Sequence, residues 1–489
     1  MTYGRPPLEK IDLRELDRIE ICPPARGPGS KTPDLALERW KAVREATVRW
    51  HHDDMPSDPS SIDGIEKDFF DGWDVIQRRV LTELFAAYRR LFPSDPTHVD
   101  LDPVAGVALH ESTNRTIGVA VQVEVRGQSG VQALRIKTGR AGTSEIEAAA
   151  FYQPEERRTL VDLRLAADDA VTIPPPEDAS QLVEDAANRW DRAVTTPRTG
   201  RVAGLHCYSC PRPARCGQYP VVGEGDVSRW TRTVLVSKSR LADVARCVRS
   251  AAWPVIYSIP RDDGDDEYDS AHLVVGNQFH RTVAAALVSD DPAAWYEAAT
   301  TTVAPSEVAD LRWLFDQHEA VWVSDPRPVS VARTEYQFGV TFVVDGVTVD
   351  RQGRVGSGNV AVTMMGVTDV NGWESAGVAA VVEHRTGSAS SALAHEADLY
   401  AVSAWHALAS LGRSVDGVAV HFHHLRADPA VCDREFYAPA RIADAEARLR
   451  EVARELAALH PTDASSPGYT TGAWCEWCQW VGKCLPSRA

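Results

Sequence analysis

The 489-residue sequence lacks the marks of several protein classes. No apolar run approaches the ~20 residues that a membrane-spanning helix needs, and the N-terminus is polar and acidic where a signal peptide would be basic and then apolar. Basic residues are not in excess, since 52 Lys+Arg against 69 Asp+Glu give a formal charge of −17. This balance argues against a broadly basic surface that coats nucleic acid. We therefore expect a cytoplasmic globular protein that has no membrane partner.

Nine cysteines are the most informative feature that is present. Disulfides are rare in the cytoplasm, so these thiols need another reason. Two triplets share the spacing C-x2-C-x5-C, and each triplet has one lone cysteine far upstream. The two resulting sets of four are Cys22, Cys207, Cys210 and Cys216, and then Cys247, Cys475, Cys478 and Cys484; Cys432 is left over.

Four thiolates suit either a tetrahedral zinc ion or a cubic iron–sulfur cluster. Structural zinc more often uses two close pairs of cysteines, whereas here one ligand is distant from the other three. The spacing therefore favours two 4Fe-4S clusters, with zinc as the alternative. Each cluster would join the beginning of a domain to its end, so its primary role is expected to be structural.

The repeated cysteine pattern belongs to a wider internal repeat. A leucine precedes each lone cysteine by six residues, and two glycines and a tyrosine then recur at matching distances. These residues are Leu16, Gly118, Gly139 and Tyr152 in the first half, and Leu241, Gly366, Gly387 and Tyr400 in the second. The sequence predicts a tandem duplication with one domain over 1–225 and another over 226–489.

Each half mixes predicted strands with predicted helices. Runs rich in Val, Thr and Ile predict strands, and amphipathic runs predict helices. In the second half the strands are expected within 336–349, 377–385 and 417–425, and the helices within 276–288, 392–411 and 440–459. In the first half a helical region is expected over 68–92. Mixed strands flanked by helices indicate an α/β fold.

Several short motifs of the second half occur in a fixed order. They are SKSRLADVARC ending at Cys247, GNQFH ending at His280, GVTD ending at Asp369, VVEHRTG with Glu383, EADLY with Glu396 and Tyr400, and a tail of the form W-C-x-W-C-x-W…C. In this order they resemble the PD-(D/E)XK nuclease superfamily. The resemblance is to its RecB branch in the iron–sulfur form, as in AddB-type helicase-nucleases and CRISPR-associated RecB-like exonucleases.

The resemblance implies tandem restriction-endonuclease-like domains, each a mixed sheet flanked by helices and closed by a four-cysteine cluster. It also implies a divalent metal site made by His280, Asp369 and Glu383, with Mg²⁺ or Mn²⁺ preferred by the carboxylate oxygens. Such a metal polarises the scissile phosphate and acidifies the attacking water. Glu396 and Tyr400 follow on a helix that borders the same site.

The sequence departs from the family at two of these positions. The family's lysine, two residues after the second acid, is Arg385, which keeps the charge but stays protonated and has a different reach. Restoring lysine at 385 is expected to raise activity if the rest of the site is intact. The family's glutamine is Glu396. In the first half the equivalent positions are Ile76, Val121, Arg135 and Lys137, so this half is expected to be catalytically dead.

The leading hypothesis is therefore a divalent-metal-dependent DNA nuclease that cuts single strands or ends with its second domain. The alternative is a pseudonuclease, a non-catalytic iron–sulfur subunit that binds DNA or acts as a scaffold in a DNA-repair or phage-defence complex. A tandem zinc protein of unrelated role is a third possibility. No Walker A motif is present, so a helicase partner would have to unwind duplex DNA. The acidic charge confines DNA to a channel near Lys137, Arg140, Arg385 and the cluster.

One further stretch of the second half contains metal-binding residue types. His421, His423 and His424 lie in the sequence HFHH. Alternate strand positions share a face, so two of these histidines could form a metal pair. A strand end rich in polar side chains is the favoured interpretation. The acidic run 262–269 is interpreted as a solvated loop because it lacks the spacing of a calcium loop.

Overall fold

The computed structural model of the chain describes residues 9–11, 13, 16, 22, 34–103, 106–110, 115–128, 130–139, 143–152, 158–195, 207, 219–223, 232–260, 271–349, 354–387, 395–469, 472, 475 and 478–484. Cys210, Cys216, Arg140 and the acidic run 262–269 lie outside the described residues.

A five-stranded mixed sheet forms the centre of the first half. Its strands, in spatial order, are β2 (His98–Asp100), β5 (Val123–Gly127), β6 (Gly130–Lys137), β7 (Arg158–Arg164) and β8 (Asp169–Ile173). A smaller sheet has the order β1 (Glu9–Lys10), β4 (Arg115–Val119) and β3 (Gly106–His110).

Helices cover both faces of the five-stranded sheet. One face packs on α2 (Leu35–His52), α3 (Pro59–Phe70) and α4 (Val75–Leu91), and the other packs on α5 (Glu145–Phe151) and α6 (Ala179–Thr195). Residues alternate between the two cores along the strands, because successive strand side chains point to opposite faces. On β6, for example, Ala133 joins the core under α5 and α6, whereas Leu134 joins the core under α2–α4.

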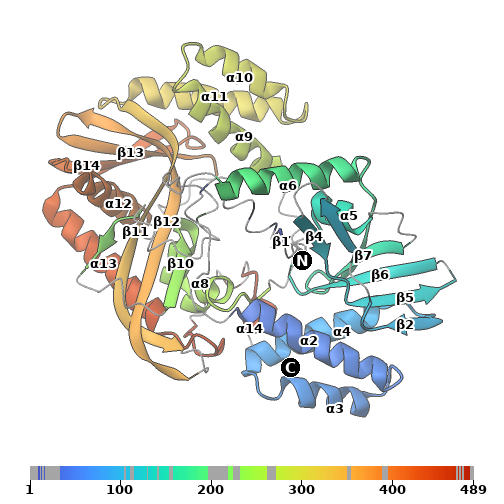
Figure 1. Cartoon of the computed structure of the whole chain (residues 1–489). Coiled ribbons are helices and arrows are strands. Elements are labelled where there is room, and N and C mark those ends of the chain that lie inside the picture. Colours follow the sequence, from blue (N-terminus) through green and yellow to red (C-terminus); the bar gives the residue numbers. More distant parts are fainter. Residues whose placement is uncertain are drawn as a thin grey trace, which may run out of the picture.

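A seven-stranded sheet forms the centre of the second half. Its order is β15 (Val431–Tyr437), β14 (Gly417–His424), β13 (Val378–Arg385), β12 (Val355–Ser375), β11 (Ser330–Val349) and β9 (Val221–Val222), and β10 (Arg232–Ser237) also pairs with β12. The long strands β11 and β12 run from top to bottom in the left-hand part of Figure 1. The predicted strands at 377–385 and 417–425 are confirmed as β13 and β14.

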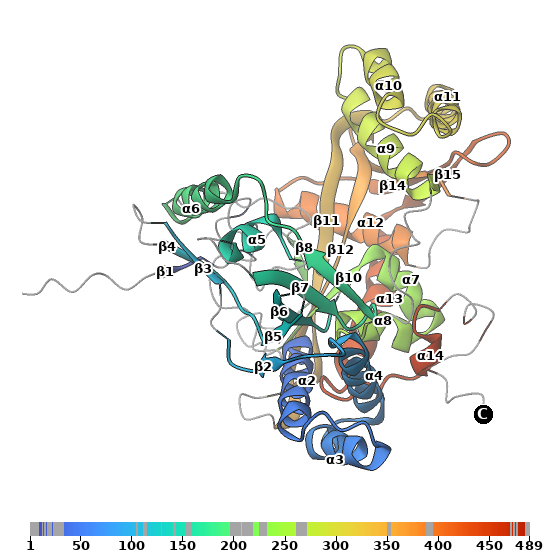
Figure 2. The same ribbon diagram turned by 90° about the vertical axis from the view of Figure 1, so that its right-hand side faces the viewer.

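The two faces of this second sheet carry different helices. One face packs on α7 (Lys238–Arg246), α8 (Val248–Val255), α12 (Glu396–Ser410) and α13 (Pro439–Ala458). The other carries α9 (Ala271–Ala286), α10 (Pro292–Thr300) and α11 (Val308–Ser324), which form their own core and project at the top of Figures 1 and 2. The short helix α14 (Val481–Cys484) lies beside α4.

The two large sheets share one topology. The pairs β2–β5, β5–β6 and β7–β8 are antiparallel and β6–β7 is parallel. The pairs β11–β12, β12–β13 and β14–β15 are likewise antiparallel, and β13–β14 is parallel. A helix follows the third strand in each half, α5 after β6 and α12 after β13. The predicted α/β architecture of mixed sheets flanked by helices is confirmed.

The helical region expected over 68–92 is broken into two helices. Helix α3 ends at Phe70 and α4 begins at Val75. Between them the Asp74 carboxylate accepts hydrogen bonds from the backbone N–H groups of Ile76 and Gln77, at 2.9 and 3.1 Å. In a continuous helix these two N–H groups would bond to carbonyls of the preceding turn. Because the Asp74 side chain accepts their hydrogen bonds instead, a new helix, α4, begins here.

The helices of the first half share a hydrophobic core with the cysteine-bearing end of the second. Trp253, Tyr257 and Trp480 pack in the same core as residues of α2, α3 and α4. Polar contacts cross the same boundary, because the backbone N–H of Ala464 donates to Asp74 at 3.1 Å. The two halves are therefore joined by a core as well as by the chain.

Arg39 is the buried polar centre of this junction. Its guanidinium donates to Gln77 Oε1 at 2.8 Å and to the carbonyl of Tyr257 at 2.7 Å, and it also donates to the carbonyl of Ser258. Burial lowers its pKa to about 10, with Asp34 and Asp74 opposing that shift.

None of the described helices is long and apolar enough to cross a membrane.

We expect Arg39→Ala to lower the free energy of unfolding by about 3 kcal/mol, because it leaves buried carbonyls without a donor. Urea denaturation followed by tryptophan fluorescence measures this. Arg49→Ala is the matched control on the same helix: its partner Asp53 is also exposed, so a change within about 0.5 kcal/mol is expected. Equal midpoints for the two variants would show that Arg39 does not hold the junction together.

Candidate active site

The two acids predicted to bind metal lie side by side where β12 and β13 separate. The antiparallel ladder between these strands ends at the pair Val370–Val382. Asp369 and Glu383 occupy the next position on each strand. The structure therefore places both carboxylates at one point of the sheet.

Asp369 is held by two histidines. Its Oδ1 contacts His280 Nδ1 at 2.8 Å, and its Oδ2 accepts the backbone N–H of His384 at 2.6 Å. The His384 ring also lies near, with Nδ1 at 3.3 Å from Oδ2. The ligand atoms of His280, Asp369 and His384 lie within 4.8 Å of one another. The side chains of His280 and Asp369 remain 28% and 17% exposed, so a ligand from solvent can reach them.

Helix α9 brings His280 to this point because Gly276 lets the helix lie close to the sheet. A Cβ atom at Gly276 would come within 3.0 Å of Thr386 Oγ1, just beyond the end of β13. His280 follows one helical turn later, on the same side of α9 as Gly276. The spacing of the predicted motif GNQFH thus has a packing reason.

Glu383 is bound by a lysine that the sequence analysis did not select. The ammonium of Lys238 donates to Glu383 Oε1, to the hydroxyl of Tyr400 at 2.9 Å and to the carbonyl of Val367 at 3.2 Å. The hydroxyl of Tyr400 donates to Glu383 Oε2 at 2.6 Å. Both carboxylate oxygens of Glu383 are therefore engaged by side chains of the chain itself.

Local structure explains why Lys238 reaches the acids. Strand β10 runs parallel to β12 and pairs Ser237 with Met365, and Ser237 then caps helix α7, whose first residue is Lys238. The lysine stem passes beside Gly366 of β12, where a Cβ atom would lie 3.2 Å from Lys238 Cδ and 2.8 Å from Phe338. Glycine at 366 thus leaves room for the lysine.

Arg385, at the family's lysine position, points to a different partner. Its guanidinium pairs with the fully buried carboxylate of Glu396. Glu396 Oε1 also lies 3.8 Å from Lys238 Nζ and 3.1 Å from the hydroxyl oxygen of Tyr400, whose one proton goes to Glu383. The arginine and the glutamate that depart from the family pattern therefore form an ion pair with each other.

Three carboxylates, those of Asp369, Glu383 and Glu396, lie close together in this site and affect one another's charge. Burial would raise the pKa of Asp369, but contacts with His280 and His384 hold it well below its usual range. Burial raises the pKa of Glu383, and although Lys238 opposes this, the neighbouring Asp369 and Glu396 add to the rise. Hard oxygen donors whose charges are this costly to bury fit a divalent cation such as Mg²⁺ or Mn²⁺.

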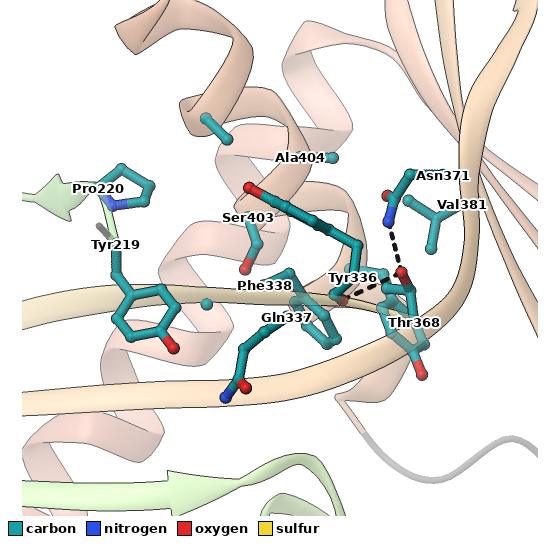
Figure 3. Close-up of a pocket in the computed structure, with 13 residues that line it drawn as sticks. Tyr219, Pro220, Tyr336, Gln337, Phe338, Thr368, Asn371, Val381, Ser403 and Ala404 are labelled. Carbon is teal, nitrogen blue, oxygen red and sulfur yellow. Dashed lines mark hydrogen bonds between the residues drawn. The ribbon is translucent and has the colours of Figure 1, made fainter. Parts of the chain in front are cut away.

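Figure 3 shows a small cavity whose lining includes Tyr400. Its volume of about 30 Å³ fits a water molecule and excludes a nucleotide. Ser403 Oγ and Gln337 Oε1, both in its lining, have no hydrogen-bond partner among the described residues. We conclude that this cavity is too small to be a substrate site.

The second set of four cysteines comes together in space. Burial raises the pKa values of Cys478 and Cys484, and the negative potential of Cys247 and Cys475 adds to both shifts. Arg249 donates to Cys484 Sγ at 3.8 Å. Of the first set, Cys22 and Cys207 are described and buried.

The first half carries no equivalent acids at the positions aligned with the site. Ile76 and Val121 are buried in hydrophobic cores. Arg135 donates to Thr143 at 2.7 Å and lies 3.4 Å from Glu147. Among the described residues of this half, no group of three or more His, Cys, Asp or Glu side chains converges as metal ligands would.

Comparison with known proteins identifies the family. Residues 235–485, slightly more than half of the chain, match the PD-(D/E)XK nuclease superfamily, and the chain belongs to this superfamily. Among solved structures, the crystal structure of SSO0001 is 11% identical, with 52% of this chain and 87% of that chain covered and a TM-score of 0.21. No curated protein matches.

Proposed function

We propose that the chain is a metal-dependent DNA nuclease of the RecB-like branch, with its active site in the second half. One observation carries the proposal. The carboxylates of Asp369 and Glu383, the ring of His280 and the ammonium of Lys238 all lie at one partly exposed point. His280, Asp369 and Glu383 would hold Mg²⁺ or Mn²⁺. The ion would supply Lewis-acid activation of the phosphate and a more acidic water.

In this proposal Lys238 takes the catalytic role of the lysine that the family has at the position of Arg385. A partly buried ammonium beside Glu383 can orient the attacking water and stabilise the negative charge that develops on the phosphate. Arg385 forms an ion pair with Glu396, and the hydrogen bond from Tyr400 fixes the orientation of Glu383. The ammonium thus reaches the acids from β10 and α7 instead of from the strand that carries Glu383.

The first half is proposed to be a catalytically dead copy, with boundaries near 1–225 and 226–489. The shared topology of the two sheets supports a duplication, and so does the parallel pairing of β1 with β4 and of β10 with β12. Arg135 replaces an acid, and Lys137 stands at the position of Arg385. The role proposed for this copy is to support the active half and to line a DNA channel.

Each set of four cysteines is proposed to bind a 4Fe-4S cluster. Cys247 and Cys475 both help to raise the pKa of Cys478 and of Cys484, which supports a shared site for the second cluster. One distant ligand with three close ones in the sequence favours the cluster over zinc.

A pseudonuclease is the alternative function, and one observation favours it. Both oxygens of Glu383 are already bound by Lys238 and Tyr400, as in a site whose acids only stabilise the fold. In that case the chain would bind DNA as a subunit of a repair or phage-defence complex, with a helicase as a fitting partner.

We expect the protein to degrade labelled single-stranded DNA in the presence of Mn²⁺. The double variant Asp369→Ala/Glu383→Ala should lose this cleavage by at least about 1000-fold, because the metal ligands are gone. Denaturing gel electrophoresis of the products measures it. His424→Ala, on β14, is a control that should cleave as the wild type does. Equal cleavage by the wild type and the double variant, or none by either, would support the pseudonuclease.

Lys238→Met should reduce cleavage by about 100-fold, the cost typical of losing one group that stabilises developing charge. DNA binding, measured by fluorescence anisotropy, should be retained. Arg385→Lys should not raise activity, contrary to the expectation from the family spacing, because Lys238 already occupies the place beside Glu383. The role of Lys238 is refuted if Lys238→Met cleaves normally and Arg385→Lys is the faster enzyme.

Anaerobically purified protein should be brown and contain about eight iron atoms per chain if both clusters are present. Cys475→Ala should lose half of this iron and lower the thermal midpoint, because the cluster closes a loop that spans most of the second half. Elemental analysis and the visible spectrum measure both effects. Unchanged colour and thermal midpoint in Cys475→Ala would show that the ligand assignment is wrong.

A further inference from the structure

A second group of metal-ligating side chains lies on the face of the sheet that carries α9–α11. Its members are Asp325, His421, His423 and Cys432, whose ligand atoms all lie within 4.8 Å of one another. The two histidines are alternate residues of β14, so they share one face. Strand β15 places Cys432 directly opposite His423, and Asp325 follows the last residue of α11. The group thus joins three elements.

The spacing of three of these atoms fits tetrahedral zinc. His421 Nδ1 lies 3.2 Å from Asp325 Oδ2 and 3.5 Å from Cys432 Sγ. Cys432 Sγ lies 3.6 Å from Asp325 Oδ2. Zinc with its usual bonds to oxygen, nitrogen and sulfur separates such atoms by about 3.3–3.6 Å. The three ligand atoms therefore already stand at the corners of one tetrahedral face.

The surroundings of His421 are those of a metal-binding histidine. Its second ring nitrogen, Nε2, contacts Glu374 Oε1 at 2.7 Å, and Glu374 is held in turn by Arg434. A carboxylate on the outer nitrogen orients the ring and turns the lone pair of Nδ1 inward, as in many zinc sites. That lone pair faces Asp325 and Cys432.

His423 supplies the fourth donor. Its side chain is 1% exposed, and neither ring nitrogen has a hydrogen-bond partner among the described residues. Leaving a buried polar group unpaired is energetically unfavourable, so such a ring is expected to have a ligand. The ring centroids of His423 and Trp322 lie 5.8 Å apart, and Trp322 also lines a cavity of about 450 Å³.

We propose that Asp325, His421, His423 and Cys432 bind one Zn²⁺ ion in a closed structural site. One thiolate and two imidazoles select zinc over Mg²⁺ or Mn²⁺, which prefer oxygen ligands. With four protein ligands, no position is left for substrate. The ion ties the end of α11 to β14 and β15, and it thereby anchors the helical layer that includes α9 and His280. The proposal is independent of nuclease activity.

Zinc and iron per chain, measured by elemental analysis of the full-length protein after dialysis against a weak chelator, test the proposal. His423→Ala and Cys432→Ser should each lose one zinc per chain and keep all the iron of the wild type. His424→Ala is the matched control. It removes the neighbouring histidine of β14, which contacts Asp433 at 3.1 Å, and should keep the zinc. Equal zinc in all four proteins, or none in the wild type, overturns the proposal.

Zinc-edge X-ray absorption of the wild-type protein keeps the test decisive if the variants fail to fold. A zinc shell with one sulfur and three nitrogen or oxygen neighbours supports the site. If all of the bound zinc has only sulfur neighbours, it occupies the cysteine sets, and the proposed site is refuted.

Discussion

The crowding of three carboxylates, two buried and one partly buried, at one point of a sheet is the constraint on which the second half depends. Asp369, Glu383 and Glu396 each need a cationic or hydrogen-bonding partner, because an uncompensated buried charge costs several kcal/mol. The partners come from three elements: His280 from α9, Lys238 from α7 and Arg385 from β13. The glycines at 276 and 366 follow from this demand, since they let α9 and the lysine stem approach the acids.

Much of the second half could be predicted from the sequence, because its signals are local. The strands and helices follow hydrophobic periodicity, and both acids stand at fixed positions of a strand motif. Lys238 could not be found in this way, since its role depends on the parallel pairing of β10 with β12, which no local pattern encodes. The absence of lysine at 385 was the available signal that a cation must come from elsewhere. His384 was hidden within the motif itself, and it contributes through its backbone N–H as well as its ring.

The HFHH stretch also shows the limit of prediction from local sequence patterns. Its alternation correctly places His421 and His423 on one face, but Cys432 lies on the next strand, β15, and Asp325 lies at the end of α11, 96 residues before His421. On their own, two histidines on one face of a strand are best interpreted as a polar strand end. Only the packing of α11 against the sheet turns the pair into a group of four. Tertiary contacts therefore decide between a structural and a ligand-binding interpretation of the same residues.

The shared core between the halves has a consequence for how this chain can change over evolutionary time. Trp253, Tyr257 and Trp480 are covered by α2–α4 of the first half. A deletion of those helices would expose aromatic surface, which promotes aggregation of a protein in the cell. Loss of the N-terminal helices is therefore disfavoured on grounds of solubility alone, whether or not the first half takes part in any chemistry.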